Sequence, residues 1–160
     1  MRVLIQRVSS AAVHVSGRQT GAIHKGLLLL AGITHKDTPE VLEAMAKKIV
    51  HMRIFPDPAG RSHFDRSVLD ENGGLLVVSQ FTLYADCRKG RRPSFTDAAE
   101  PARASNLLDQ FVGYLRAYPL QVQTGEFGAL MDVSLVNDGP VSIWLDSDES
   151  LARRPKHAEA

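Results

Sequence analysis

The chain of 160 residues contains a single cysteine and almost no net charge, and both shortages limit what it can be. With Cys87 alone, no internal disulfide can form, which fits a reducing compartment. The formal net charge of +1 gives the molecule as a whole no attraction for nucleic acid. Any RNA contact must therefore come from a local basic patch.

The sequence also lacks a segment that suits a membrane. Its longest apolar run, residues 27–31, is far shorter than a bilayer span. Residues 1–7 lack the long apolar stretch of a signal peptide. We therefore expect a cytoplasmic protein with no membrane partner. Its 44% hydrophobic and 23% charged residues suit a globular domain.

The familiar catalytic signatures are missing as well. There is no Gly-x-Ser-x-Gly elbow and no His-Glu-x-x-His helix. The histidines at positions 14, 24, 35, 51, 63 and 157 show no metal-ligand spacing, so we expect no metal site. Cys87 stands beside Arg88 and Lys89, which favour a reactive thiolate, although an incidental loop thiol is the simpler interpretation.

What is present is a pattern of strands and two helices. Strands are predicted at residues 3–8, 12–15, 21–33, 75–78, 120–124 and 131–145, the last interrupted at 137–140. The run 27–30 is continuous rather than alternating, which predicts burial on both faces. Helices are predicted from Pro39, after a capping Thr38, and over residues 101–117. This order predicts an α+β fold, with a mainly antiparallel sheet and two helices packed on it.

The composition changes near the C-terminus. From Ser147 onward, serine, alanine and charged residues dominate, together with Pro155. We therefore predict one domain over residues 1–146 and a disordered tail over residues 147–160.

Two polar segments are candidate sites. Ser79-Gln80-Phe81-Thr82 follows a buried strand, where hydroxyls, an amide and backbone N–H groups can hold a substrate or an oxyanion. These residue types also suit an ordinary strand end, and spacing alone favours that simpler interpretation. Asn137-Asp138-Gly139-Pro140 has the composition of a hairpin turn. Within it, Gly139 lets the backbone approach a ligand closely, and Pro140 admits a cis bond.

A basic loop is the third candidate. It places four cations in five positions around Gly90, namely Arg88, Lys89, Arg91 and Arg92. Such a cluster can bind phosphate groups. A solvated basic loop is an equally good interpretation.

Five segments in order give a more specific indication. Ser-Gln-Phe-Thr-Leu at 79–83 and Asn-Asp-Gly-Pro-Val at 137–141 resemble the paired motifs of the D-aminoacyl-tRNA deacylase family, also called D-Tyr-tRNA deacylases. Residues 1–8, 90–95 and 124–131 resemble that family's first strand, its basic loop and the stretch before the second motif. The resemblance covers roughly residues 1–146, and five motifs in family order are highly specific.

The resemblance implies a homodimer of barrel-like α+β protomers, in which a loop of one protomer completes the pocket of the other. Gly139 and Pro140, joined by a cis bond, would form a chiral gate whose direction Arg7 fixes. The remaining site residues follow from the same resemblance. Ser79, Gln80, Phe81 and Thr82 would receive the aminoacylated 3′ adenosine, and Asn137, Phe127 and Met131 are supporting candidates.

The activity that the resemblance implies is hydrolysis of the ester in D-aminoacyl-tRNA, and also in glycyl-tRNA, as translation quality control. L-Aminoacyl-tRNA would be excluded because its Cβ would collide with the Gly-Pro backbone. An aminoacyl ester is already activated, and its ribose hydroxyl assists attack by water, so backbone N–H groups supported by Thr82 can suffice. No nucleophilic side chain and no cofactor are then required, and aminoacyl-tRNA rather than DNA is the partner.

Two other interpretations stay open. A non-catalytic RNA-binding module would use residues 88–92 and would bind tRNA without cleaving it. A conventional hydrolase would use Ser79 or Cys87 as its nucleophile.

Overall fold

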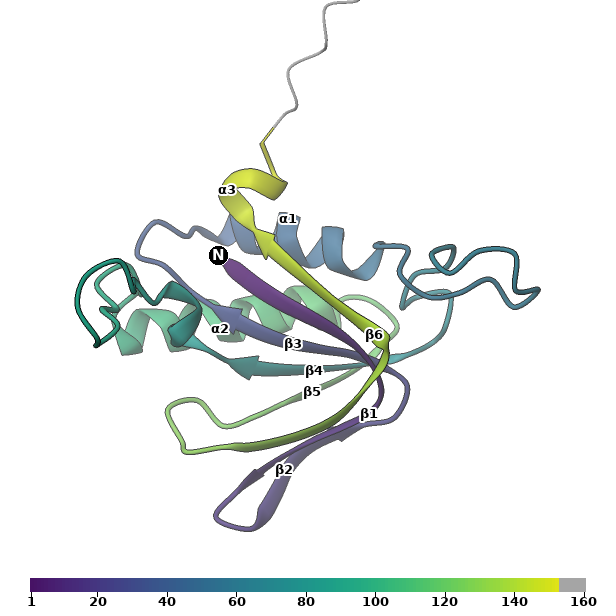
Figure 1. Cartoon of the computed structure of the whole chain (residues 1–160), viewed down its shortest axis with the longest axis horizontal. Coiled ribbons are helices and arrows are strands. Elements are labelled where there is room, and N and C mark those ends of the chain that lie inside the picture. The colour runs from purple at the N-terminus through teal and green to yellow at the C-terminus, as the bar shows by residue number, and fades with distance from the viewer. Residues whose placement is uncertain (153–160) are drawn as a thin grey trace, which may run out of the picture.

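The computed structural model describes residues 1–152, which form a curled six-stranded sheet with helices on one side (Figure 1). The strands are β1 (Arg2–Val15), β2 (Arg18–Ile23), β3 (Gly26–Gly32), β4 (Gly74–Ser79), β5 (Gln121–Thr124) and β6 (Asp132–Asp146). The helices are α1 (Pro39–Val50), α2 (Pro101–Arg116) and the short α3 (Ser147–Ser150), with a 3-10 turn, η1 (Phe81–Tyr84), after β4.

The sheet is mainly antiparallel, as predicted, and it also contains two parallel strand pairs. Its order is β2-β1-β3-β4-β5, with β6 paired to β1. The long β1 pairs antiparallel with β2, β3 and β6, whereas β3 with β4 and β4 with β5 are parallel. The parallel pairs arise because α1 and α2 each return the chain to the same end of the sheet before the next strand. The predicted α+β class with a mainly antiparallel sheet is confirmed.

The sheet curls until its two ends almost meet. A Cβ built on Gly21 of β2 would lie 2.6 Å from the carbonyl oxygen of Thr124 in β5. Only glycine admits this approach of two backbones. The sheet is therefore nearly closed, as the resemblance to barrel-like protomers implied.

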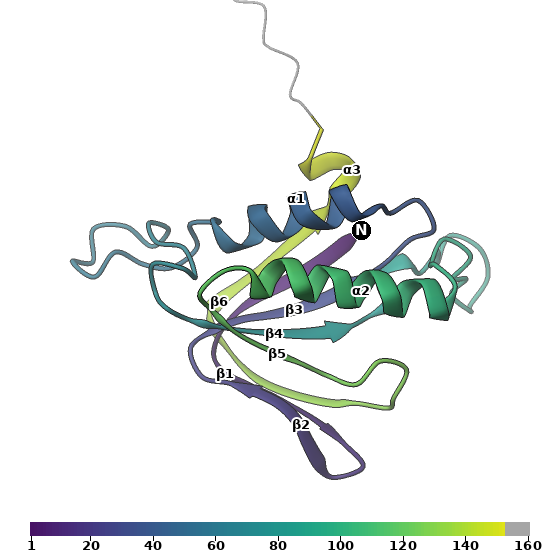
Figure 2. The ribbon, with the colours of Figure 1, turned by 180° about the vertical axis from the view of Figure 1, so that it is seen from behind.

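The central strands are buried on both faces, as their continuous apolar run predicted. Leu27 and Leu29 of β3 pack in the core beneath α1 and α2. Between them, Leu28 faces the inside of the curled sheet, with Val8 and Leu76. Figure 2 shows α1 and α2 side by side over the same side of the sheet. Two apolar layers thus hold the ends of β3 and β4 in place.

The expectation of a disordered tail from Ser147 is wrong for the first residues of that segment. Ser147 is buried, and its Oγ accepts a hydrogen bond of 2.6 Å from the Met1 amino group. Oδ1 of Asp146 accepts a hydrogen bond of 3.0 Å from the backbone N–H of Asp148, which caps α3. Composition could not reveal this contact because the partner comes from the other end of the chain. Residues 153–160 lie outside the described residues.

None of the helices within residues 1–152 is long and apolar enough to cross a membrane.

Candidate active site

A cavity of about 660 Å³ opens where β3 and β4 end. Its walls come from the ends of these two strands, the start of α2 and the loop that precedes β6. Five of the predicted site residues line it together: Ser79, Gln80, Phe81, Phe127 and Met131. Thr82 does not line the cavity, although its hydroxyl accepts a hydrogen bond from the Gln80 amide.

The turn after β4 is held against β3 by backbone contacts. The Gln80 N–H donates a hydrogen bond of 2.8 Å to the Ala31 carbonyl. A Cβ built on Gly32 would lie 2.9 Å from the Gln80 carbonyl oxygen, so glycine permits this close packing. The chain then forms the 3-10 turn η1. Phe81, the first residue of this turn, lines the cavity, and 58% of the surface of Phe81 is exposed. The sequence predicted the polar strand end correctly, and the 3-10 turn fixes its direction.

The opposite wall is the loop that links β5 to β6. The Gly125 N–H donates a hydrogen bond of 3.0 Å to the Val77 carbonyl, which ties this loop to β4. A Cβ on Gly125 would lie 2.6 Å from Met131 Sδ, so Met131 packs directly over the bare glycine. Phe127 and Met131 thereby face Ser79 and Gln80 across one cavity.

The second predicted motif lies within β6, where the pairing with β1 is interrupted as expected although the strand itself continues. β6 continues through residues 137–140, with irregular register against β1. Asn137 bridges the irregularity, because its Oδ1 accepts a hydrogen bond from the Val141 N–H at 3.1 Å and its Nδ2 donates one to Ser142 Oγ at 2.9 Å. The Gly139–Pro140 peptide is cis, as the resemblance implied, and Gly139 has a φ of 126°.

Arg7 braces this segment against the chain that follows α1. Its side chain is largely buried, with the residue 8% exposed. Its Nε lies 3.1 Å from both the carbonyl oxygen and Oδ2 of Asp138, and its Nη1 donates a hydrogen bond of 2.6 Å to the Ile54 carbonyl. Arg7 therefore connects the chain before Gly139 to the segment after α1, where the resemblance expected it to act.

The structure does not bring Gly139 and Pro140 to the cavity of their own chain, and neither residue lines it. The strand register shows the distance. Arg7 pairs with Leu27, whereas the cavity begins four residues further along β3, at Ala31. At about 3.3 Å per residue, the two points are roughly 13 Å apart along the strand. The two predicted motifs therefore form separate places on one protomer.

The sequence profile of the D-Tyr-tRNA(Tyr) deacylase family matches residues 4–146. This chain belongs to that family.

Individual relatives agree with this assignment. A protein of Thermomicrobium roseum named D-aminoacyl-tRNA deacylase is 58% identical over 149 residues, which cover 93% of this chain and 96% of the relative. A solved structure titled c-Myc DNA Unwinding Element Binding Protein superposes with a TM-score of 0.86 at 41% identity, covering 91% of this chain and 98% of the other. A structure described as a probable eukaryotic D-amino acid tRNA deacylase has a TM-score of 0.76 at 17% identity, over 90% and 97% of the two chains, and supports the fold.

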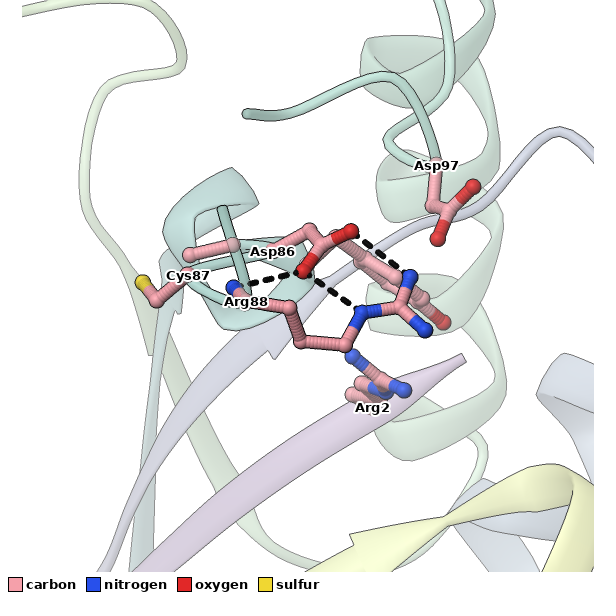
Figure 3. Close-up of a pocket in the computed structure, with 7 residues that line it drawn as sticks. Arg2, Asp86, Cys87, Arg88 and Asp97 are labelled. Atoms are coloured by element: carbon pink, nitrogen blue, oxygen red, sulfur yellow. Dashed lines mark hydrogen bonds and ion pairs between the residues drawn. The ribbon is translucent and has the colours of Figure 1, made fainter. Parts of the chain in front are cut away.

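In this deacylase-family chain, one cation of the basic loop forms an ion pair within the loop. Arg88 forms an ion pair with Asp86, with Nε 2.8 Å from Oδ1 and Nη2 2.7 Å from Oδ2 (Figure 3). These hydrogen bonds, together with one from the Arg88 N–H, hold the pKa of the Asp86 carboxyl well below its usual range. A second cavity, of about 450 Å³, lies here beside Arg2 and Tyr84. Arg88 therefore lines this second cavity and not the first one, which contains Ser79 and is called the Ser79 cavity below.

Sequence reasoning missed part of the cavity wall. Phe95 packs edge-on against Phe81, with ring centroids 4.9 Å apart, and both rings line the cavity. The start of α2 supplies the apolar side through Ala104 and Leu108. Phe95 stands within the basic-loop segment that resembles the family, so that segment was a usable signal. The α2 residues look like ordinary helix-core positions and carry no such signal.

Proposed function

We propose that this chain hydrolyses the ester bond of D-aminoacyl-tRNA and releases a free D-amino acid and tRNA. The observation that carries this proposal is the Ser79 cavity. It gathers Ser79, Gln80 and Phe81 opposite Phe127 and Met131 in a member of the deacylase family. We place the reaction in translation quality control in the cytoplasm.

The chemistry rests on positioning rather than on a nucleophilic side chain. The ester of an aminoacyl-tRNA is activated, and the adjacent ribose hydroxyl assists attack by water. Backbone N–H groups of the turn that follows Gln80, whose own N–H is bonded to Ala31, then stabilise the negative charge on the carbonyl oxygen. Thr82 supports this turn through its hydrogen bond with the Gln80 side chain. Apolar walls strengthen these donors because they exclude water.

Chiral selection requires a second copy of the chain. Gly139 and Pro140 are exposed. They lie in the part of the sheet where Arg7 pairs with Leu27, about 13 Å along β3 from Ala31 at the usual rise per residue of a β-strand. Among the described strands, β6 pairs with β1 alone, which leaves its other edge open for association. In a homodimer, the Gly139–Pro140 backbone of one protomer would reach the cavity of the other. Rigid backbone there would exclude the Cβ of an L-residue and accept both D-residues and glycine.

We expect the purified protein to cleave D-Tyr-tRNA and to leave L-Tyr-tRNA intact. A gate that excludes a misplaced Cβ sterically discriminates far more strongly than a soft apolar pocket does. Release of labelled tyrosine from each charged tRNA measures the two rates, and glycyl-tRNA provides the third substrate. Equal rates on the two enantiomers would refute the gate. Binding of tRNA without cleavage would favour a non-catalytic RNA-binding module.

Cys87→Ala is expected to leave deacylation unchanged, within about twofold. Cys87 is exposed, and Figure 3 shows its sulfur pointing away from the Arg88–Asp86 pair. It lines the second cavity and not the cavity of Ser79. Initial rates on D-Tyr-tRNA test this expectation directly. Loss of most activity, or labelling of the wild-type protein at Cys87 by a covalent inhibitor that stops turnover, would support a cysteine hydrolase instead.

A further inference from the structure

The segment 86–94 forms a closed basic loop that leads directly into one wall of the Ser79 cavity. Its two ends are joined because Asp86 and Ser94 exchange backbone hydrogen bonds of 2.7 and 2.9 Å. Gly90, with a φ of 72°, turns the chain at the tip. The next residue, Phe95, packs edge-on against Phe81 and lines the cavity. The loop therefore ends at a wall of the cavity.

The four cations of the loop do not share one environment. Arg88 donates its backbone N–H and two guanidinium N–H groups to the Asp86 carboxylate, at 3.0, 2.8 and 2.7 Å. Its charge is thus compensated within the loop. Lys89, Arg91 and Arg92 are exposed, and no carboxylate in residues 1–152 forms an ion pair with them.

The neighbouring cavity does not suit an anion. Its lining carries two cations, Arg2 and Arg88, and two carboxylates, Asp86 and Asp97 (Figure 3). Arg2 is also paired, with its Nε 2.8 Å from Oδ2 of Asp146. Because the cations here are compensated, a phosphate gains little by entering. The uncompensated positive charge stands at the loop tip.

We propose that Lys89, Arg91 and Arg92 bind phosphates of the single-stranded 3′ end of tRNA, while Arg88 is an internal brace that does not touch RNA. The proposal rests on the proposed function, because the ester that enters the cavity is attached to that 3′ end. Cations spaced along a short loop match the phosphates of a strand that follows it. Exposed guanidinium and ammonium groups bind such phosphates with a strong salt dependence.

The salt dependence of binding separates the two roles. Each phosphate contact on a single strand contributes about 0.7 to the slope of log K against log salt concentration. Deacylated tRNA is the probe. Fluorescence anisotropy gives the binding constant of the full chain at salt concentrations between about 50 and 200 mM, and these constants give the slope. We expect Lys89→Ala, Arg91→Ala and Arg92→Ala each to lower the slope by about 0.7, and the triple variant by about 2.

Arg88→Ala is the matched variant in the same loop. It is expected to keep the wild-type slope, even where a less ordered loop weakens binding at every salt concentration. Arg61→Ala, an exposed and paired cation in the segment between α1 and β4, is the control for net charge. An equal fall in slope for Arg88→Ala and Arg91→Ala would overturn the brace. An unchanged slope in the triple variant would overturn the RNA contact.

A single-turnover assay on D-Tyr-tRNA separates this proposal from the proposed function. Cleavage by the wild-type protein together with an unchanged slope in the triple variant would reject the loop contact and keep the deacylase. A reduced slope in the triple variant, with no cleavage by the wild-type protein, would keep the RNA contact and reject the deacylase.

Discussion

Gly139→Ala is expected to lower kcat/KM on D-Tyr-tRNA by about 100-fold or more, because a displacement of about 1 Å at a reacting centre has costs of that order. Gly139 has a φ of 126°, which an L side chain rarely adopts. An added Cβ would lie 2.9 Å from Val141 Cγ2 and 3.0 Å from Arg7 Nη2. The segment must therefore move, and the backbone wall that it offers to the substrate moves with it.

Steady-state rates on D-Tyr-tRNA, with circular dichroism as a check of folding, measure this effect. Gly60→Ala is the control, since Gly60 also has a positive φ, of 72°, but a Cβ there would meet nothing within 4 Å. The control carries the backbone penalty without the displacement near Arg7. A folded Gly139→Ala variant with the wild-type kcat/KM would show that the substrate does not approach this backbone closely.

Much of the fold could be predicted from the sequence because the patterns that indicate its helices and strands are local. The apolar run of β3 predicted a strand buried on both faces, and Leu27 and Leu28 do face opposite cores. Pro39 and Pro101 stand in the first turn of α1 and α2, where the missing proline N–H costs nothing. Such features need no knowledge of distant parts of the chain.

The features that were missed depend on contacts that composition does not indicate. Ser147 reads as the start of a polar tail, and only its contact with the Met1 amino group orders it. Arg88 looked equivalent to its neighbours in the sequence, and only the folded loop places both its donors on Asp86. Composition gives the formal charge of a segment. How much of that charge is left without an ion-pair partner depends on how the chain folds.

The candidate site shows the same limit. The two motifs were recognisable, and the fold places Ser79 at the cavity as expected. Their separation on one protomer, with Gly139 beside Arg7 and away from the cavity, follows from no residue pattern and was expected only from the family resemblance. The residue types and spacing of two motifs do not indicate by themselves whether the motifs meet within one chain or between two copies.

Arg7→Lys is expected to reduce the free energy of unfolding by about 2–3 kcal/mol and kcat/KM by about 100-fold. Arg7 is 8% exposed and reaches two carbonyl groups, those of Ile54 and Asp138. Lysine carries one ammonium group in place of the planar fork, so it cannot span both acceptors. One buried carbonyl then loses its partner, and the chain before Gly139 loses its brace.

Chemical denaturation measures the stability of the Arg7→Lys variant, and rates on D-Tyr-tRNA measure its activity. Arg103→Lys is the matched control, because Arg103 Nη2 also donates to a backbone carbonyl, that of Asp37 at 2.9 Å, but outside the site. We expect the control to keep both its stability and its kcat/KM near the wild-type values, because Arg103 is exposed and lysine can still reach one carbonyl. Equal losses of activity in the two variants would mean that Arg7 acts on stability alone.

The combination of Arg7→Lys with Gly139→Ala tests whether both residues control the same segment. An alanine Cβ at position 139 would press against Arg7 Nη2, so the two side chains compete for one place. Lysine removes the competing atom, and the second substitution then adds little to the first. We expect the double variant to lose far less activity than the product of the two single losses, whereas independent sites would multiply their losses. Arg7 would then be a positioning residue whose effect on the substrate passes through Gly139.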